Sequence, residues 1–345
     1  MLAAAWPHMS GDLASTRRGA AVFLDNLEDI ALAIGRHNWV ARWTNIGDAH
    51  FVLSEKNFKK GALAEATDAW LCALTAFEVA RRLVDEDDPK SEEILAKVDA
   101  SIQRFGLSLE QKVEQVLIAS DQSEFFAYYF SPVGRHPSAP AVICISREEE
   151  TGAALLGRLL PAVISRGFAV LVVSHEEVSA QWRGQSELAL SSCLDYLSGQ
   201  PGVDGARIGI YGEGLSAALA TDFAISDRRV AAAVCDGGLW DWARTLASVG
   251  RKTKPADVLD ESVLAARRSR LARKLRCPVL VVAGGRGTVS VSEAIKLQTD
   301  CRAARVDLEL AMPRMTRTSI GEIENFVSSD DYIFGWLEHK LATAQ

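Results

Sequence analysis

The spacing of apolar positions changes about one third of the way along the chain. In 20–35, 63–84 and 91–105 apolar residues recur at helical intervals, and 63–84 carries Trp70, Leu74 and Phe77 on one side. These patterns predict helices. Residues 1–110 are therefore expected to form an N-terminal helical region.

From residue 112 onward, short apolar runs alternate with amphipathic stretches. Strands are expected at 112–120, 124–130, 141–145, 168–173, 207–211, 230–235, 278–283 and 306–310. Helices are expected at 151–166, 186–198, 215–226, 263–275, 291–304 and 332–341. Strands that are apolar on both faces and alternate with helices indicate a mostly parallel sheet covered on both sides. We predict a doubly wound α/β domain over 111–345, with a short lid-like insertion around 238–275.

Composition narrows the classes of partner. The formal net charge of -7 argues against a nucleic-acid partner, since binding a phosphate backbone needs positive charge. No apolar run is long enough to span a membrane, and the first residues lack the apolar stretch of a signal peptide, so a cytoplasmic protein without a membrane partner is expected. The six cysteines form no CxxC pair and are expected to be buried free thiols. No metal-ligand spacing and no strand-opening GxGxxG occurs, so no metal or other cofactor is expected.

The most informative stretch is 203–220. An apolar strand runs into Gly212-Glu213-Gly214, and a helix of small residues follows. This is the layout of a nucleophile elbow, in which glycines tighten the turn between strand and helix. Ligands of such sheets bind at the carboxyl ends of the strands, where this turn is expected.

The order of these motifs resembles that of the α/β-hydrolase superfamily, and within it the FrsA-like branch that includes 2,6-dihydroxypseudooxynicotine hydrolase. The stretches 161–173, 238–242 and 276–282 are similar to further family segments. The resemblance implies the α/β-hydrolase fold, a helical N-terminal region and a homodimer. It also implies a small aromatic or polyketide-like carbonyl compound as ligand, handled in secondary metabolism.

The chain departs from the family pattern at each catalytic position. With Arg207-Ile208-Gly209 setting the register, the nucleophile falls on Gly214. In the loop after Val282, the place of the acid falls on Gly287. The turn 312–319, where the family has its histidine, contains none. The oxyanion loop begins with 146–150 (SREEE) instead of glycines. Because a serine nucleophile needs its base, its orienting acid and its oxyanion donors together, these losses indicate lost or replaced chemistry.

Three residues are candidates for catalysis. Glu213 lies at the elbow and can act as a general base if its pKa is raised; the alternative is a carboxylate favoured by a helix N-terminus. His175 follows a strand and is expected at the active edge; the alternative is a surface or fully hydrogen-bonded histidine. Ser216 becomes a nucleophile if the register shifts by two; the alternative is a small helix residue packed on the sheet. No histidine is expected within reach of Ser216.

Other residues at this edge are candidates for substrate binding: Arg147, Gly214, Leu215, Asp236, Trp240 and Arg286. Arg147, Arg286, Arg314 and Arg317 all follow expected strands, so they are expected at one sheet edge. There they either bind an anion or pair with neighbouring acids and fill the cleft. Trp240 either lines a pocket for an aromatic ligand or packs in the core at the base of the lid.

Three functions are consistent with these features. The first is a pseudo-hydrolase that binds a small molecule or serves as the non-catalytic partner of an active paralogue in a hetero-oligomer. The second is a non-hydrolytic enzyme, such as a cyclase or lyase, in which Glu213, His175 or an arginine assists. The third is a residual ester or C–C bond hydrolase that uses Ser216. A fold alone does not decide between them.

Overall fold

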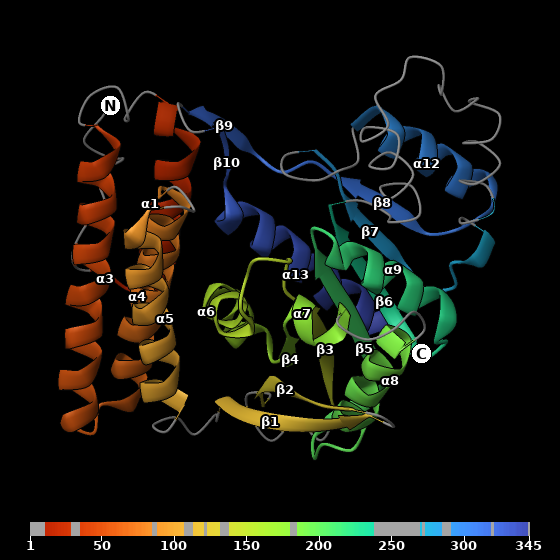
Figure 1. The fold of residues 1–345 in the computed structure, drawn as a ribbon, viewed down its shortest axis with the longest axis horizontal. Coiled ribbons are helices and arrows are strands. Elements are labelled where there is room, and N and C mark those ends of the chain that lie inside the picture. The colour runs from red at the N-terminus through yellow and green to blue at the C-terminus, as the bar shows by residue number, and fades with distance from the viewer. Residues whose placement is uncertain are drawn as a thin grey trace. The chain divides into compact units, whose positions relative to one another are not determined.

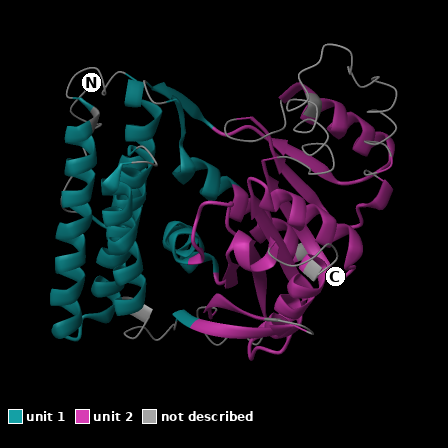
Figure 2. Ribbon diagram, viewed as in Figure 1, with its two compact units in different colours: residues 1–114, 153–166, 314–332 teal, residues 115–152, 167–313, 333–345 magenta. Residues whose placement is uncertain are grey.

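The computed structural model describes residues 11–28, 35–84, 88–106, 113–120, 123–131, 138–179, 185–237, 270, 273–284, 291–318 and 321–343. These residues form two compact units, which Figure 2 distinguishes by colour. The helical unit comprises 1–114, 153–166 and 314–332, and the sheet unit comprises 115–152, 167–313 and 333–345. The lid-like insertion expected around 238–275 lies almost wholly outside the described residues.

The helical unit is built from helices of the first third of the chain and from later segments. Its first helices are α1 (Leu13–Asp25), α3 (Arg36–Lys59), α4 (Leu63–Arg82) and α5 (Pro89–Gly106). Later segments complete it: most of α6 (Gly152–Val163), the short 3-10 helix η2 (Ile164–Arg166), the antiparallel pair β9 (Met315–Thr318) and β10 (Gly321–Glu324), and the start of α13 (Phe326–Thr343).

Helix α4 is the centre of this unit because its residues are buried on nearly every side. It packs against α1, α3 and α5 and buries Trp70 and Phe77 completely or almost so. The Trp70 indole donates a hydrogen bond of 3.1 Å to the carbonyl of Ser101 in α5. A β-carbon at Gly47 of α3 would overlap the Phe77 ring, so glycine at this position lets the two helices approach.

The sheet unit contains a mixed sheet of eight strands in the order β1-β2-β4-β3-β5-β6-β7-β8. The strands are β1 (Val113–Ser120), β2 (Ser123–Phe130), β3 (Ala139–Ile145), β4 (Ala169–Val173), β5 (Val203–Glu213), β6 (Val230–Asp236), β7 (Val279–Val282) and β8 (Leu308–Ala311). Strand β2 pairs antiparallel with β4, and the pairs from β4 through β8 are parallel. The predicted doubly wound, mostly parallel sheet is therefore confirmed.

Helices cover both faces of this sheet (Figure 1). On one face α8 (Gln185–Ser198), α9 (Ser216–Ser226) and α12 (Val291–Ala303) share one apolar core with the strands. On the other face α13 supplies Phe334, whose ring lies 6.3 Å from Phe168 and 6.2 Å from Tyr211. The short helix α7 (His175–Ser179) follows β4 directly. Among the described residues no helix is both long and apolar enough to cross a membrane.

Several elements differ from the predicted ones in their extent or are not among them. The helix expected at 20–35 begins at Leu13, because the Asp12 carboxylate accepts a hydrogen bond of 2.8 Å from the Ser15 N–H and so caps the helix seven residues earlier than the apolar pattern does. The long helix α3 is not among the predicted elements. Strand β9 lies in the stretch 312–319, where a turn is expected, and no element is predicted for β10.

Candidate functional site

The turn between β5 and α9 has the geometry of a tight strand-to-helix elbow. Gly214 has φ +63°, in the left-handed region that side chains other than glycine rarely adopt. A β-carbon at Gly212 would collide with the backbone carbonyl of Ser216, so the first turn of α9 lies directly against the strand. Both glycines are thus required by the backbone of the elbow.

The carboxylate of Glu148 lies over the elbow. Its Oε2 accepts a hydrogen bond of 3.2 Å from the backbone N–H of Leu215. A β-carbon built on Gly214 would lie 2.8 Å from the same oxygen and 3.3 Å from the β-carbon of Arg147. Glu148 is exposed, so water competes for this hydrogen bond and its contribution to stability is small. The carboxylate nevertheless fills the space that a side chain at 214 would enter.

The loop that carries Glu148 is held by its own hydrogen bonds. The Ser146 hydroxyl donates to the carbonyl of Glu150 at 2.6 Å, and the Glu150 N–H donates to the carbonyl of Arg147 at 3.1 Å. Ser146 is fully buried at the end of β3. The position of Glu148 therefore follows from a tight turn that starts at the buried edge of the sheet.

His175 and Ser216 are in direct contact. The Nδ1 of His175 lies 2.7 Å from the Ser216 hydroxyl oxygen, and that hydroxyl lies 2.6 Å from the carbonyl oxygen of Ser146. The backbone N–H of His175 donates to the Ser146 hydroxyl at 3.1 Å. The expectation that no histidine reaches Ser216 is wrong. Residues 41 positions apart in sequence meet because β4 and β5 flank β3 in the sheet.

The direction of these hydrogen bonds follows from the atoms involved. A carbonyl oxygen has no proton to donate, so the Ser216 hydroxyl proton lies on its contact with Ser146. The oxygen of Ser216 then accepts from His175, which requires the proton on Nδ1. Within the described ranges no residue hydrogen-bonds to the Nε2 of His175, so this atom presents an open lone pair.

Burial favours the neutral form of this imidazole. Desolvation lowers the pKa of His175 below its ordinary value, and the nearby carboxylates of Glu148 and Glu176 oppose this shift in pKa. A neutral imidazole with a fixed tautomer and a lone pair on Nε2 is able to accept a proton at neutral pH.

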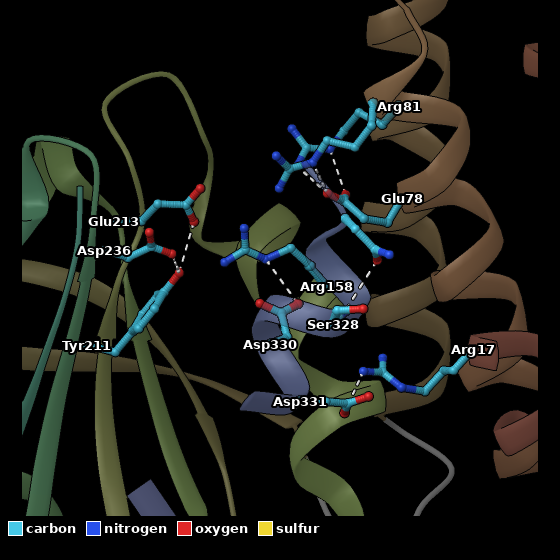
Figure 3. A network of polar contacts seen from close by, with 12 residues as sticks. Arg17, Glu78, Arg81, Arg158, Tyr211, Glu213, Asp236, Ser328, Asp330 and Asp331 are labelled. Atoms are coloured by element: carbon cyan, nitrogen blue, oxygen red, sulfur yellow. Dashed lines mark hydrogen bonds and ion pairs between the residues drawn. The ribbon is translucent and has the colours of Figure 1, made fainter. Parts of the chain in front are cut away.

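Glu213 and Asp236 share one phenol. The Tyr211 hydroxyl lies 3.1 Å from the Glu213 carboxylate and 3.3 Å from that of Asp236, as the close-up in Figure 3 shows. The two acids are aligned in register on β5 and β6. A phenol has a single proton, so it donates fully to one carboxylate at a time. Glu213 is only 8% exposed and is engaged by a buried tyrosine at this edge of the sheet.

The remaining candidates divide into two groups. Trp240 and Arg286 lie outside the described residues, as does Gly287. Arg314 and Arg317 pair with Asp25 at 3.0 Å and with Glu322 at 3.5 Å, inside the helical unit. The expectation that these two arginines join Arg147 at the edge of the sheet is therefore wrong, because the chain leaves the sheet unit after Pro313.

Sequence reasoning missed the role of Glu148 and Ser146. The three successive glutamates after β3 mark an unusual loop, but nothing in their order indicates which one faces the elbow. Among the residues that the structure describes, no group of three or more His, Cys, Asp or Glu is placed to hold a metal. All six cysteines are buried free thiols.

Solved structures of other proteins share this architecture. No protein-family model and no curated protein matches the sequence. Among solved structures, the 2,6-dihydroxy-pseudo-oxynicotine hydrolase is similar with a TM-score of 0.60 and 18% identity, covering 94% of this chain and 96% of that chain. An acylaminoacyl peptidase of Pyrococcus horikoshii is similar with a TM-score of 0.52 and 13% identity, covering 70% of this chain and 44% of that chain.

These likenesses show the fold. The chain has the α/β-hydrolase fold, and the expected resemblance to 2,6-dihydroxypseudooxynicotine hydrolase is confirmed at the level of the fold. A fold shared at this level of identity does not fix the reaction, so the residues of this chain's own site decide its chemistry.

Proposed function

We propose that this protein is a pseudo-hydrolase, which binds a small carbonyl compound at the elbow and does not form a covalent serine intermediate. The observation that carries the proposal is the Glu148 carboxylate, which hydrogen-bonds the Leu215 N–H beside a glycine at 214. In a serine hydrolase the nucleophile stands at such an elbow, and the N–H of the next residue stabilises the oxyanion.

The hydrogen bonds of Ser216 support this proposal. A serine nucleophile has to give its proton to a histidine that accepts it. Ser216 is fully buried, its proton is directed to the Ser146 carbonyl, and His175 acts as a donor toward it. Ser216 therefore serves as a structural link between the first turn of α9, the end of β3 and His175.

The occupied N–H of Leu215 argues in the same direction. An oxyanion hole stabilises negative charge that develops during the reaction, so its donors must be available at that moment. A carboxylate on the same N–H competes with the developing oxyanion and repels it. We infer that ligands enter as neutral carbonyl compounds, of the small aromatic class that the name of the pseudo-oxynicotine hydrolase suggests.

The direct test is labelling with a fluorophosphonate probe together with hydrolysis of p-nitrophenyl acetate. We expect no label and no hydrolysis above the rate of Ser216→Ala. Ser226→Ala provides the matched control, since Ser226 is an exposed residue of the same helix whose hydroxyl donates to the carbonyl of Phe223. A label that Ser216→Ala abolishes and Ser226→Ala retains would falsify the proposal.

A second function is favoured by one observation, the open Nε2 of a neutral His175. A base held in one tautomer can remove a carbon-bound proton from a carbonyl compound without a covalent intermediate, which is the first step of an elimination. The Kemp elimination of 5-nitrobenzisoxazole tests this without a known substrate, because one base removes the carbon-bound proton while the ring N–O bond breaks. We expect turnover that His175→Gln removes and that the exposed His37→Gln retains. Equal rates in wild type and His175→Gln would exclude this function.

A further inference from the structure

We propose that the helical unit contains a second binding site, which takes a small organic carboxylate. A pocket of about 650 Å³ is formed by α1, Asp68 of α4, the end of α6 with η2, and the start of α13. All of its lining residues belong to the helical unit. This volume lies in the range of sites for small molecules. The proposal is independent of the function proposed for the elbow, which lies in the sheet unit.

A buried guanidinium is the central feature of this pocket. Arg17 is only 7% exposed, and its Nη2 donates a hydrogen bond of 2.8 Å to Asp331, as Figure 3 shows. Its Nη1 is shielded from water and has no hydrogen-bond acceptor among the described residues. A guanidinium carries five N–H donors in a planar fork that suits a carboxylate, so a ligand carboxylate that replaces Asp331 on Nη2 would also engage Nη1.

Two further arginines line the same pocket. Arg18 is exposed on α1, and the Nη2 of Arg166 lies 3.5 Å from the Asp331 carboxylate. The other two acids of the pocket are engaged by the start of α1: Asp12 accepts from Ser15 N–H at 2.8 Å, and Asp68 accepts from the Leu13 N–H at 3.2 Å. The backbone thus occupies these two acids, whereas the Nη1 of Arg17 has no acceptor among the described residues.

The rest of the lining favours an organic anion over an inorganic one. It consists largely of apolar side chains that offer contact area and no hydrogen bonds: Leu13, Ala14, Ala21, Pro161, Ala162 and Val327. Sites of this composition bind ligands with an apolar body and one or two polar groups that fix their orientation. A carboxylate on a small hydrocarbon or aromatic body matches both parts of the pocket.

Asp331 is the internal competitor of such a ligand. Its side chain is 48% exposed, yet it holds Arg17 at 2.8 Å and contacts Arg166. A ligand carboxylate would bind beside it or replace it on the same guanidinium. Removing the charge of Asp331 is therefore expected to strengthen anion binding, whereas removing the charge of an arginine is expected to weaken it.

Isothermal titration of the full chain with benzoate tests the site, with neutral benzamide and inorganic phosphate as reference ligands. We expect benzoate to bind more tightly than either. Arg17→Gln should weaken benzoate binding about tenfold and Arg18→Gln about threefold, while Asp331→Asn should strengthen it about threefold. Arg314→Gln is the matched control, since Arg314 pairs with Asp25 in the same unit outside the pocket, and it should leave binding unchanged.

The opposite directions of these changes keep the proposal open to refutation even if Arg17→Gln fails to fold. Arg18 is exposed and Asp331 half-exposed, so their variants are expected to remain folded, which circular dichroism checks. The proposal is overturned if benzoate and benzamide bind equally or benzoate does not bind at all. It is also overturned if phosphate binds as tightly as benzoate, or if Arg18→Gln and Asp331→Asn leave benzoate binding unchanged.

Discussion

Replacement of Ser216 by alanine isolates the link between His175, α9 and β3. The change removes one oxygen that accepts from His175 at 2.7 Å and donates to Ser146 at 2.6 Å. Ser216 and the Ser146 residue are both 0% exposed, so no water replaces the lost donor at the carbonyl. The variant therefore leaves a buried carbonyl without this hydrogen bond, and it releases the Nδ1–H of a half-buried histidine.

The expected loss of stability is the sum of separate contributions from the Ser146 carbonyl and the His175 ring N–H. A buried carbonyl that loses its donor costs about 1–3 kcal/mol, whereas the half-buried Nδ1–H can turn to water and costs less, about 0.5 kcal/mol. Alanine is the better helix former and returns up to about 0.5 kcal/mol at the first turn of α9. We expect Ser216→Ala to lower the free energy of unfolding by about 2 kcal/mol and Ser226→Ala to change it by less than about 0.5 kcal/mol.

Two measurements check this reasoning. Urea unfolding gives the free-energy change, with hydrogen exchange of the β5 amides reporting on the sheet unit because two compact units can unfold separately. Nitrogen-15 chemical shifts of the His175 ring give the tautomer, and we expect a protonated Nδ1 and an unprotonated Nε2 in the wild type. An unprotonated Nδ1 would show that Ser216 donates to His175, which refutes the assigned direction and restores Ser216 as a potential nucleophile.

Gly47→Ala should destabilise the helical unit by about 1–3 kcal/mol because its β-carbon overlaps the Phe77 ring, whereas Gly19→Ala, which meets no neighbouring atom, should be neutral or stabilising; urea unfolding compares them. Stability should fall between about pH 7.5 and pH 5.5, because burial lowers the pKa of His50 in the folded state and the unfolded chain takes up the proton first. In unfolding measured at both pH values, His50→Leu should reduce this loss without abolishing it, since the pKa of His175 is lowered in the same direction. Burial raises the pKa of five of the six thiols, so the native protein should react slowly with Ellman's reagent, whereas the unfolded chain should react quickly at all six positions. Fast reaction of the native protein would contradict the burial of these thiols.

The elements that the sequence predicts well are those whose pattern is local. Strand β4 (Ala169–Val173) is buried at every position, and its uninterrupted apolar run is visible in the sequence. Helix α8 (Gln185–Ser198) was expected within one residue of its observed start. In both cases the apolar residues of the element itself indicate which positions are buried, so the element can be predicted without knowing its neighbours.

Helix α3 was missed because its burial depends on partners. It buries Trp39, Trp43 and Ile46, but it also exposes Val52 and Phe58, at 66% and 43%, and these exposed apolar residues obscure the helical period. Strands β9 and β10 are short, and apolar and polar residues alternate only weakly along them, so the sequence predicts a loop there. Tertiary packing determines whether both of these elements form, and a single sequence does not show which segments pack together.

The elbow also contains some residues that a local sequence pattern predicts and others whose contacts depend on distant parts of the chain. Its glycines were predictable, because a tight turn with a left-handed residue requires them and the register of Arg207-Ile208-Gly209 fixes their place. The groups that decide its chemistry come from 67 and 41 residues away: Glu148 reaches the Leu215 N–H, and His175 reaches Ser216.

These contacts cannot be predicted from the sequence because the residues are far apart in it. For the contact between His175 and Ser216, the identity of the two residues alone suggests the wrong role. A histidine 2.7 Å from a serine suggests an active dyad, but the carbonyl of Ser146 holds the serine's proton and reverses the donor. The direction of these hydrogen bonds therefore depends on a backbone carbonyl, which no sequence motif records. For the same reason, the tautomer of His175 distinguishes the proposed pseudo-hydrolase and proton-transfer functions from residual hydrolysis.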